Sequence, residues 1–180
     1  MNPLIINLYG APGAGKSTGG AYIYSELKKR GIHTRMVWLE ELEDELANGT
    51  QWLEGTVCTV IQTIDNLTKL YMPEVIINIY PVGQILIDDE DLATNYYDHI
   101  FDKNAKNYLL LRVKSYIGDG RNHTEEESND IGRKLRRHLD VIGLKHSAVG
   151  GHKEGYDCII DDIIYELEKR KDWERFNQCY

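Results

Sequence analysis

The stretch Gly10–Ser17 has the residue types and the spacing of a phosphate-binding loop. It reads G-A-P-G-A-G-K-S, which matches the pattern G-x-x-x-x-G-K-[ST], and Thr18 follows it directly. Its glycines permit backbone conformations in which N–H groups point inward at phosphate oxygens. We expect Lys16 to reach the β- and γ-phosphates of a nucleotide, Ser17 to hold Mg²⁺, and Thr18 to bond an α-phosphate oxygen. The residues expected to bind the phosphates are Gly10, Gly13, Ala14, Gly15, Lys16, Ser17 and Thr18.

Residues 112–127 form the second stretch whose side chains suit phosphate chemistry. Arg112 and Arg121 lie on either side of a glycine-rich turn, and T-E-E-E at 124–127 is a capping box that starts a helix. Phosphoryl transfer needs positive charge at the transferring group and exclusion of water. We interpret residues 114–124 as a lid that brings both arginines to the phosphates. The alternative is a surface loop whose arginines pair with the following glutamates.

Short apolar runs alternate with helical patterns along the chain. Strands are expected at 4–9, 34–39, 75–80, 108–113 and 147–149, and helices at 17–30, 57–71, 124–140 and around 159–167. This alternation predicts an α/β three-layer sandwich with a parallel sheet of about five strands. We expect a single domain over residues 1–180, within which residues 82–98 show no clear pattern.

The phosphate loop by itself does not name a reaction, because it occurs in several classes of protein. The N-K-x-D motif with which GTPases read their base does not occur in the chain. The third expected strand ends in N-I-Y-P and lacks the Asp-Glu ending of an AAA-type ATPase. A compact P-loop NTPase of the kinase type remains.

The motifs resemble those of the small P-loop kinases of tailed bacteriophages, which are nucleoside- and nucleotide-kinase-like proteins of adenylate-kinase-type fold. The resemblance rests on the G-A-P-G-A-G-K-S-T opening, on R-x3-Y-x3-G-R-x2-T-E-E-E, and on V-G…G-Y-D at residues 149–157. Some members are similar to enzymes of free nucleotides, and others to kinases of hydroxymethylated pyrimidines in phage DNA. The resemblance implies ATP and Mg²⁺ as cofactors. It also implies that Gly150, Gly151 and His152 lie near the adenine.

The chain departs from this family at the end of the third expected strand. Related kinases carry an acidic residue there, in a pattern like D-S-P, which orients Mg²⁺-bound water. This chain has Asn78 followed by I-Y-P, and an amide can bond a metal-bound water but supplies no charge. Asp88 and Asp89 are the alternative acids. The departure favours a second hypothesis, that of a nucleotide-binding regulatory protein with little catalytic activity.

A kinase also needs a carboxylate that accepts the proton of its acceptor hydroxyl. Glu40 directly follows the strand expected at 34–39, where doubly wound folds place such groups, and Glu41 is the second choice. The segment 40–102 lacks the arginines that a phosphate acceptor would need, so it favours a neutral hydroxyl. Four further side chains are candidates for contacting a planar acceptor: Trp38, Trp52, Gln62 and Tyr71.

The composition excludes several classes of protein. With 42% hydrophobic and 28% charged residues the chain can fold around a core, and its net charge of −8 argues against a surface that coats nucleic acid or anionic membrane. No membrane span or signal peptide is expected, and the three cysteines lack metal or disulfide spacing. We therefore expect a cytoplasmic location, in the host cytoplasm if the chain is phage-encoded.

The sequence thus predicts an ATP-dependent phosphotransferase that moves the γ-phosphoryl group to a hydroxyl of a nucleoside, nucleotide or modified pyrimidine. The candidate catalytic residues are Lys16, Glu40, Arg112 and Arg121. A kinase of hydroxymethylated pyrimidines in phage DNA is an alternative, favoured by the charge of +5 over residues 103–153, which carry eleven basic and six acidic residues. The expected partners are a nucleoside triphosphate and a small nucleoside-like acceptor or modified DNA base, without a membrane. The oligomeric state is not predicted.

Overall fold

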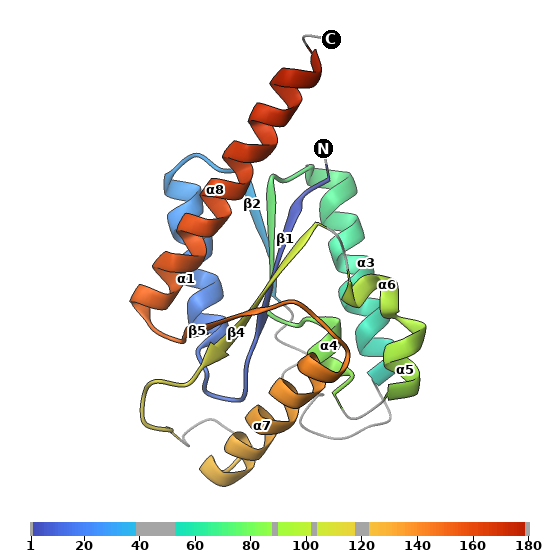
Figure 1. Cartoon of the computed structure of the whole chain (residues 1–180), viewed down its shortest axis with the longest axis vertical. Helices are drawn as coiled ribbons and strands as arrows, with labels where there is room; N and C mark the ends of the chain where they lie inside the picture. Colours follow the sequence, from blue (N-terminus) through green and yellow to red (C-terminus); the bar gives the residue numbers. More distant parts are fainter. Residues whose placement is uncertain (1, 39–52, 88–89, 102–103, 118–122, 179–180) are drawn as a thin grey trace.

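The computed structural model describes residues 2–38, 53–87, 90–101, 104–117 and 123–178. At the centre of this part of the chain lies a parallel sheet of five strands (Figure 1). The strands are β1 (Leu4–Tyr9), β2 (Thr34–Val37), β3 (Val75–Asn78), β4 (Ala105–Leu111) and β5 (Ser147–Gly150). Their order in the sheet is β2-β3-β1-β4-β5. The prediction of an α/β fold with about five parallel strands is confirmed.

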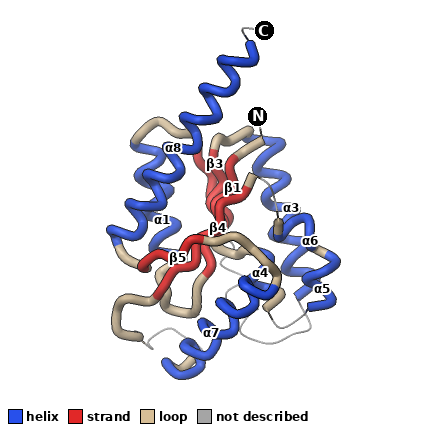
Figure 2. Tube along the Cα trace, viewed as in Figure 1, coloured by secondary structure: helices blue, strands red, loops and turns tan. Residues whose placement is uncertain are grey.

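Helices cover both faces of the sheet. They are α1 (Lys16–Lys29), α3 (Leu53–Tyr71), α4 (Val82–Ile85), α5 (Glu90–Asn95), α6 (Tyr97–Ile100), α7 (Glu125–Val141) and α8 (Lys153–Gln178). Helices α1 and α8 lie on one side of the sheet, and α3, α5 and α6 lie on the other (Figure 2). Helices α4 and α7 lie near the carboxyl ends of the strands (Figure 1). None of the described helices is long and apolar enough to cross a membrane.

The central strands are apolar on both faces because helices pack against both. In β1 the side chains of Leu4, Ile6 and Leu8 are at most 1% exposed, and in β3 residues 75–77 are fully buried. Strand β1 pairs with β3 on one side and with β4 on the other, so that Ile6 lies between Ile77 and Lys106. This pairing places the carboxyl ends of all three strands at one edge, where the phosphate loop begins.

Two ends of regular structure are set by side chains that bond to the backbone. Thr124 and Glu127 form the predicted capping box at the start of α7, and the backbone N–H of Thr124 lowers the pKa of the Glu127 carboxyl. Strand β3 ends at Asn78, two residues earlier than expected, because the Asn78 side chain accepts a hydrogen bond of 3.0 Å from the N–H of Tyr80. This local turn leads the backbone away from the hydrogen bonds that join β3 to its neighbouring strands.

Two further differences from the sequence-based expectation concern the start of β4 and the region without a clear pattern. Strand β4 starts at Ala105 instead of 108, because its first, more polar residues also pair with β1. The residues 82–98, which showed no clear pattern, lie largely in three short helices. Such short helices have too few turns to show a helical repeat in the sequence.

Candidate functional site

The phosphate loop connects the carboxyl end of β1 to the start of α1. Gly13 and Gly15 have φ angles of 79° and 94°, which are left-handed conformations that L side chains rarely adopt. Gly15 is the N-cap of α1, and its carbonyl accepts the Gly19 N–H at 2.7 Å. The loop therefore turns sharply into a helix that begins at the carboxyl end of β1, and the free N–H groups at a helix N-terminus favour anions.

Lys16 reaches back across this loop. Its Nζ donates a hydrogen bond of 2.6 Å to the carbonyl oxygen of Gly10, the residue that follows β1. Ser17 and Thr18 lie in the same first turn of α1, so the structure brings together all the residues from 10 to 18 that were expected to bind phosphates. Their contacts with a nucleotide remain predictions.

Three side chains from distant elements hold the backbone of the phosphate loop. The hydroxyl of Tyr156 in α8 donates to the Gly15 carbonyl at 3.0 Å, and that of Ser128 in α7 donates to the Pro12 carbonyl at 2.7 Å. The third is Gln84 of α4, whose carboxamide bonds both the N–H and the carbonyl of Gly10. None of these three contacts was expected from the sequence. Among the three residues only Tyr156 belongs to a motif that the sequence shows, the G-Y-D at residues 155–157.

A cavity of about 500 Å³ adjoins the loop on the side of α8. Gly151 and His152, which the family resemblance placed near the adenine, line it, and Gly150 directly precedes them. The Gly151 N–H donates to the Leu111 carbonyl at 2.8 Å and so fixes the turn after β5 against the end of β4. The other lining residues are Gly13, Gly15, Thr18, Tyr22, Val113, Lys114, Ser115, Tyr116, Ile117, Lys153 and Tyr156.

An ionic cluster borders this cavity. Asp157 accepts hydrogen bonds from Lys153 at 2.6 Å and from the Tyr22 hydroxyl at 2.8 Å. These two donors hold the pKa of the Asp157 carboxyl below its usual value, and the same carboxylate raises the pKa of Lys153 and of Tyr22. Lys153 therefore stays positively charged at neutral pH beside a cavity that also has aromatic walls.

Arg112 follows β4 and is tied to α7. Its guanidinium donates to Glu125 at 3.2 Å, bonds to Asn129, and lies 3.5 Å from the Ser128 hydroxyl that contacts the phosphate loop. The pairing with Glu125 matches the surface-loop alternative for this arginine. Arg121 lies outside the described residues. Residues 114–117, the described beginning of the expected lid, line the cavity beside the loop.

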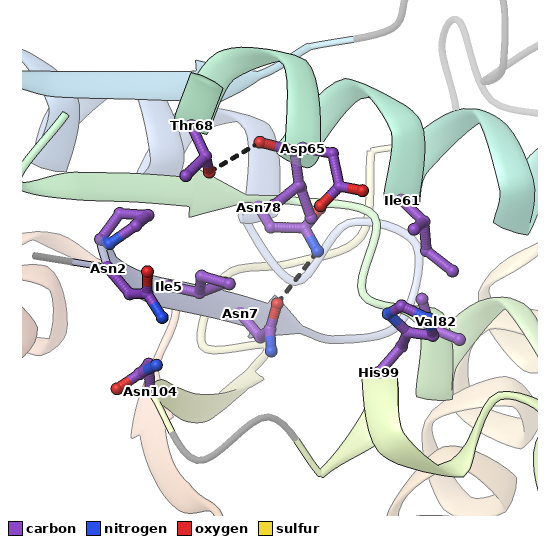
Figure 3. Close-up of a pocket in the computed structure, with 12 residues that line it drawn as sticks. Asn2, Ile5, Asn7, Ile61, Asp65, Thr68, Asn78, Val82, His99 and Asn104 are labelled. Atoms are coloured by element: carbon purple, nitrogen blue, oxygen red, sulfur yellow. Dashed lines mark hydrogen bonds between the residues drawn. The ribbon is translucent and has the colours of Figure 1, made fainter. Parts of the chain in front are cut away.

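The end of β3 carries the amide Asn78, at the position where the kinases that the motifs resemble carry an acid. Asn78 donates to Asn7 at 3.0 Å, and Asn7 donates to Asn107 at 2.9 Å, so a row of amides crosses three neighbouring strands. Figure 3 shows the bond between Asn78 and Asn7 beside a cavity of about 210 Å³ beneath α3. Asn78 is only 2% exposed, and both its polar atoms bond to the protein. It serves the sheet, and a bond from it to a metal-bound water stays a prediction.

The acceptor side lies largely outside the described residues. This holds for the candidate base Glu40, for Glu41 and Trp52, and for the alternative acids Asp88 and Asp89. Trp38 follows β2 and is 40% exposed, and Gln62 is an exposed residue of α3.

The prediction that Tyr71 contacts an acceptor is wrong. Tyr71 is the last residue of α3, four residues before β3 begins, and therefore lies at the edge of the sheet opposite the phosphate loop. There the guanidinium of Arg35, near the start of β2, lies 4.1 Å from the centre of its ring.

The predicted Mg²⁺ can be tested against the donor atoms present. Among the described residues no group of three or more His, Cys, Asp or Glu side chains could hold a metal ion. Mg²⁺ at nucleotide sites is bound by one or two protein oxygens, by substrate phosphates and by water. The Ser17 hydroxyl, in the first turn of α1 beside the glycine loop, supplies such an oxygen. The donor set therefore fits Mg²⁺ that is bound chiefly through a nucleotide.

The sheet order, the loop after β1 and the helix that it opens define an α/β fold of the P-loop kinase type. No family model matches the chain, and no curated protein matches its sequence. Among solved structures it is similar to thymidylate kinase from Ehrlichia chaffeensis, with 12% identity, a TM-score of 0.56, and coverage of 93% of this chain and 100% of the other. It is also similar to YorR protein from Bacillus subtilis in complex with phosphorylated GDP, with 18% identity, a TM-score of 0.54, and coverage of 93% of this chain and 98% of the other. A third similar structure is thymidylate kinase from Candida albicans, with 13% identity, a TM-score of 0.52, and coverage of 94% of this chain and 93% of the other. These similarities establish the fold.

Proposed function

We propose that the protein is an ATP-dependent phosphotransferase that transfers the γ-phosphoryl group to a hydroxyl of a nucleoside, nucleotide or modified pyrimidine. The observation that carries the proposal is the glycine loop between β1 and α1, with Lys16 beside it and a 500 Å³ cavity next to it. The fold supports the same class of activity, because the similar solved structures include two proteins named as thymidylate kinases.

The donor nucleotide would bind with its phosphates on the loop and its base in the adjoining cavity. Gly13 and Gly15 orient backbone N–H groups toward phosphate oxygens, and Lys16 neutralises charge on the β- and γ-phosphates. The base would lie near Gly150 and Gly151, where aromatic side chains and the charged Lys153 border the cavity. The ring faces there suit a planar heterocycle.

Mg²⁺, when bound, would draw negative charge away from the transferring phosphoryl group. Ser17 is the residue proposed to hold it. Arg121 and Arg112 are proposed to neutralise the remaining charge, Arg112 after leaving its contacts with α7. Glu40 is proposed to accept the proton of the acceptor hydroxyl.

A second candidate is a nucleotide-binding protein with little turnover. The observation that favours it is the buried amide of Asn78, which stands where related kinases have an acid and is fully engaged in the sheet. Both candidates bind nucleotide through the same loop, and they differ only in phosphate transfer.

The test is calorimetric titration of the wild type and of Lys16→Ala with MgATP. We expect the wild type to bind and Lys16→Ala to lose most of the affinity, because it lacks the amine that neutralises the terminal phosphates. Lys29→Ala, at the other end of α1 and paired only with Glu26 among the contacts described, is the matched control and should bind like the wild type. Equal affinity of the wild type and Lys16→Ala would contradict the proposal.

Radiolabelled γ-phosphate then separates the two candidates. The wild type is incubated with labelled ATP and with nucleosides, nucleotides and DNA that contains hydroxymethylated pyrimidines. Transfer to one of these acceptors supports the kinase and identifies its substrate class. Tight binding of ATP without transfer to any of them supports the binding protein.

A further inference from the structure

Ser128 is a buried polar side chain near the start of α7. It is 1% exposed, and its hydroxyl lies 2.7 Å from the carbonyl oxygen of Pro12 in the phosphate loop. A carbonyl oxygen can only accept a hydrogen bond, so the single hydroxyl proton of Ser128 must point at Pro12. The guanidinium of Arg112 lies 3.5 Å from the same hydroxyl oxygen. The hydroxyl is therefore a buried donor whose direction is fixed.

The part of the loop that Ser128 contacts is a β-turn of type II. The Ala14 N–H donates to the Ala11 carbonyl at 3.0 Å, Pro12 is the second residue of the turn, and Gly13 is the third, with a φ angle of 79°. Glycine also adopts the negative φ of a type I turn, in which the peptide between Pro12 and Gly13 is rotated by roughly 180°. The turn residues by themselves therefore permit both orientations of this peptide.

The contact with Ser128 selects one of the two orientations. Among the contacts described, the Pro12 oxygen accepts a hydrogen bond from Ser128 alone. No cis peptide bond occurs in the described part of the chain, and in a planar trans peptide the carbonyl and the N–H point in opposite directions. A donor that holds the Pro12 oxygen toward α7 therefore holds the Gly13 N–H away from α7.

The Gly13 N–H is available to a ligand in this orientation. Gly13 is half-buried and lines the cavity of about 500 Å³, whose other lining residues come from the loop, α1, residues 113–117 and the start of α8. Among the described contacts this N–H donates to no protein acceptor. An inward-pointing backbone N–H of this kind, beside a helix N-terminus, suits an anionic oxygen.

We propose that Ser128 is a positioning residue that holds the peptide between Pro12 and Gly13 in the orientation in which the Gly13 N–H bonds a phosphate oxygen of the nucleotide. This inference rests on the proposed function, since it concerns the same loop. It requires no movement on binding, because the peptide already has this orientation in the structure. The nucleotide then does not have to supply the free energy of rotating the peptide.

The test compares Ser128→Ala with the wild type in calorimetric titrations with ATP and with tripolyphosphate, both in the presence of Mg²⁺. Tripolyphosphate has the phosphates of ATP without its base. We expect Ser128→Ala to bind both about 10-fold more weakly, which corresponds to one hydrogen bond to a charged group. Thr63→Val is the control, because it removes a hydroxyl that donates at 2.8 Å to the Thr59 carbonyl in α3, and it should bind both ligands like the wild type.

Ser128→Cys separates the hydrogen bond from packing. A thiol fills the space of the hydroxyl but is a weak donor. We expect Ser128→Cys to weaken ATP and tripolyphosphate nearly as much as Ser128→Ala does. Binding of both ligands with wild-type affinity by Ser128→Cys would overturn the proposal, because it would show that Ser128 acts on the loop by packing alone.

Amide hydrogen exchange at saturating MgATP, followed by NMR, tests the Gly13 N–H itself. The nucleotide should protect this N–H at least 10-fold less in Ser128→Ala than in the wild type, while the Thr18 N–H in the first turn of α1 is protected equally in both. Equal loss of protection at Gly13 and Thr18 would overturn the proposal, because Ser128 would then maintain the loop as a whole.

The titrations also distinguish failure of this inference from failure of the proposed function. A wild type that binds both ligands, together with a Ser128→Ala protein of unchanged affinity, would overturn the role of Ser128 and leave the proposed function intact. A wild type that binds neither ATP nor tripolyphosphate would overturn the proposed function and the inference with it.

Discussion

The substitution Gly151→Ala tests how closely the turn after β5 supports the phosphate loop. A Cβ atom at position 151 would lie 1.9 Å from the carbonyl oxygen of Ala14 and 3.2 Å from that of Leu111. Both neighbours are backbone atoms, so neither can rotate out of the way. The loop and the turn would have to separate by more than 1 Å to restore an ordinary contact.

The size of the effect follows from this displacement. Forcing an extra carbon into a packed site costs about 1–3 kcal/mol of unfolding free energy, and we expect Gly151→Ala near the upper end because it meets only backbone. A shift of about 1 Å in groups that position a reacting phosphate can reduce turnover about 100-fold. We therefore expect a marked loss of stability together with a loss of phosphate transfer that exceeds the loss of ATP affinity.

Urea denaturation and steady-state kinetics measure the two effects. Gly55→Ala is the matched control, because a Cβ at position 55 in α3 would have no atom within 4 Å. Gly55 is the third residue of α3, so the alanine should increase the unfolding free energy by no more than the about 0.5–1 kcal/mol of a helix interior, and it should leave transfer unchanged. A Gly151→Ala protein with the stability and activity of the wild type would refute the close approach of turn and loop.

Three further predictions address the lid, the acceptor and the cluster beside the cavity. Arg121→Ala should lower kcat by more than it lowers nucleotide affinity, because a lid arginine acts chiefly on the transition state; a loss of affinity at unchanged kcat in steady-state assays would contradict this. Glu40→Gln should abolish transfer in the labelled-phosphate assay and retain ATP binding in calorimetry, whereas transfer at the wild-type rate would exclude Glu40 as the base. The pKa of Asp157 is lowered by Lys153 and Tyr22, so its stabilising effect is present above pH 3.8 and is lost as the pH falls below that value. Urea denaturation should therefore show Asp157→Asn to be less stable than the wild type at pH 6, with a difference that shrinks below pH 3.8; a difference that does not depend on pH would contradict the pairing.

The sequence predicted those features that depend on neighbouring residues. The apolar run of β1, the glycines of the loop and the capping box at Thr124 each leave a local pattern, and all three elements form where they were expected. The contacts that hold the loop leave no such pattern. Ser128 lies 116 residues from its partner Pro12, and Tyr156 lies 141 residues from Gly15, so only the order of the strands brings them together.

The strand register explains why the third strand carries an amide. Asn7 lies opposite Asn78 on one side and Asn107 on the other, so the three side chains share one face and one level of the sheet. Each bond in the row needs a donor and an acceptor, and a carboxamide offers both on one side chain.

An aspartate at position 78 would break this row. It would place a carboxylate oxygen against the acceptor oxygen of Asn7 and bury a negative charge at a site that is 2% exposed. The amide at the end of β3 thus has a role in the sheet that is independent of catalysis, so transfer of labelled phosphate, and not the missing acid, separates the kinase from the binding protein. An acid that orients Mg²⁺-bound water would have to lie outside this row of amides, and Asp88 and Asp89 stay the proposed alternatives. Glu40, which follows the neighbouring strand β2 in the sequence, is proposed for a different task, that of the base, so the row of amides leaves that part of the kinase proposal intact.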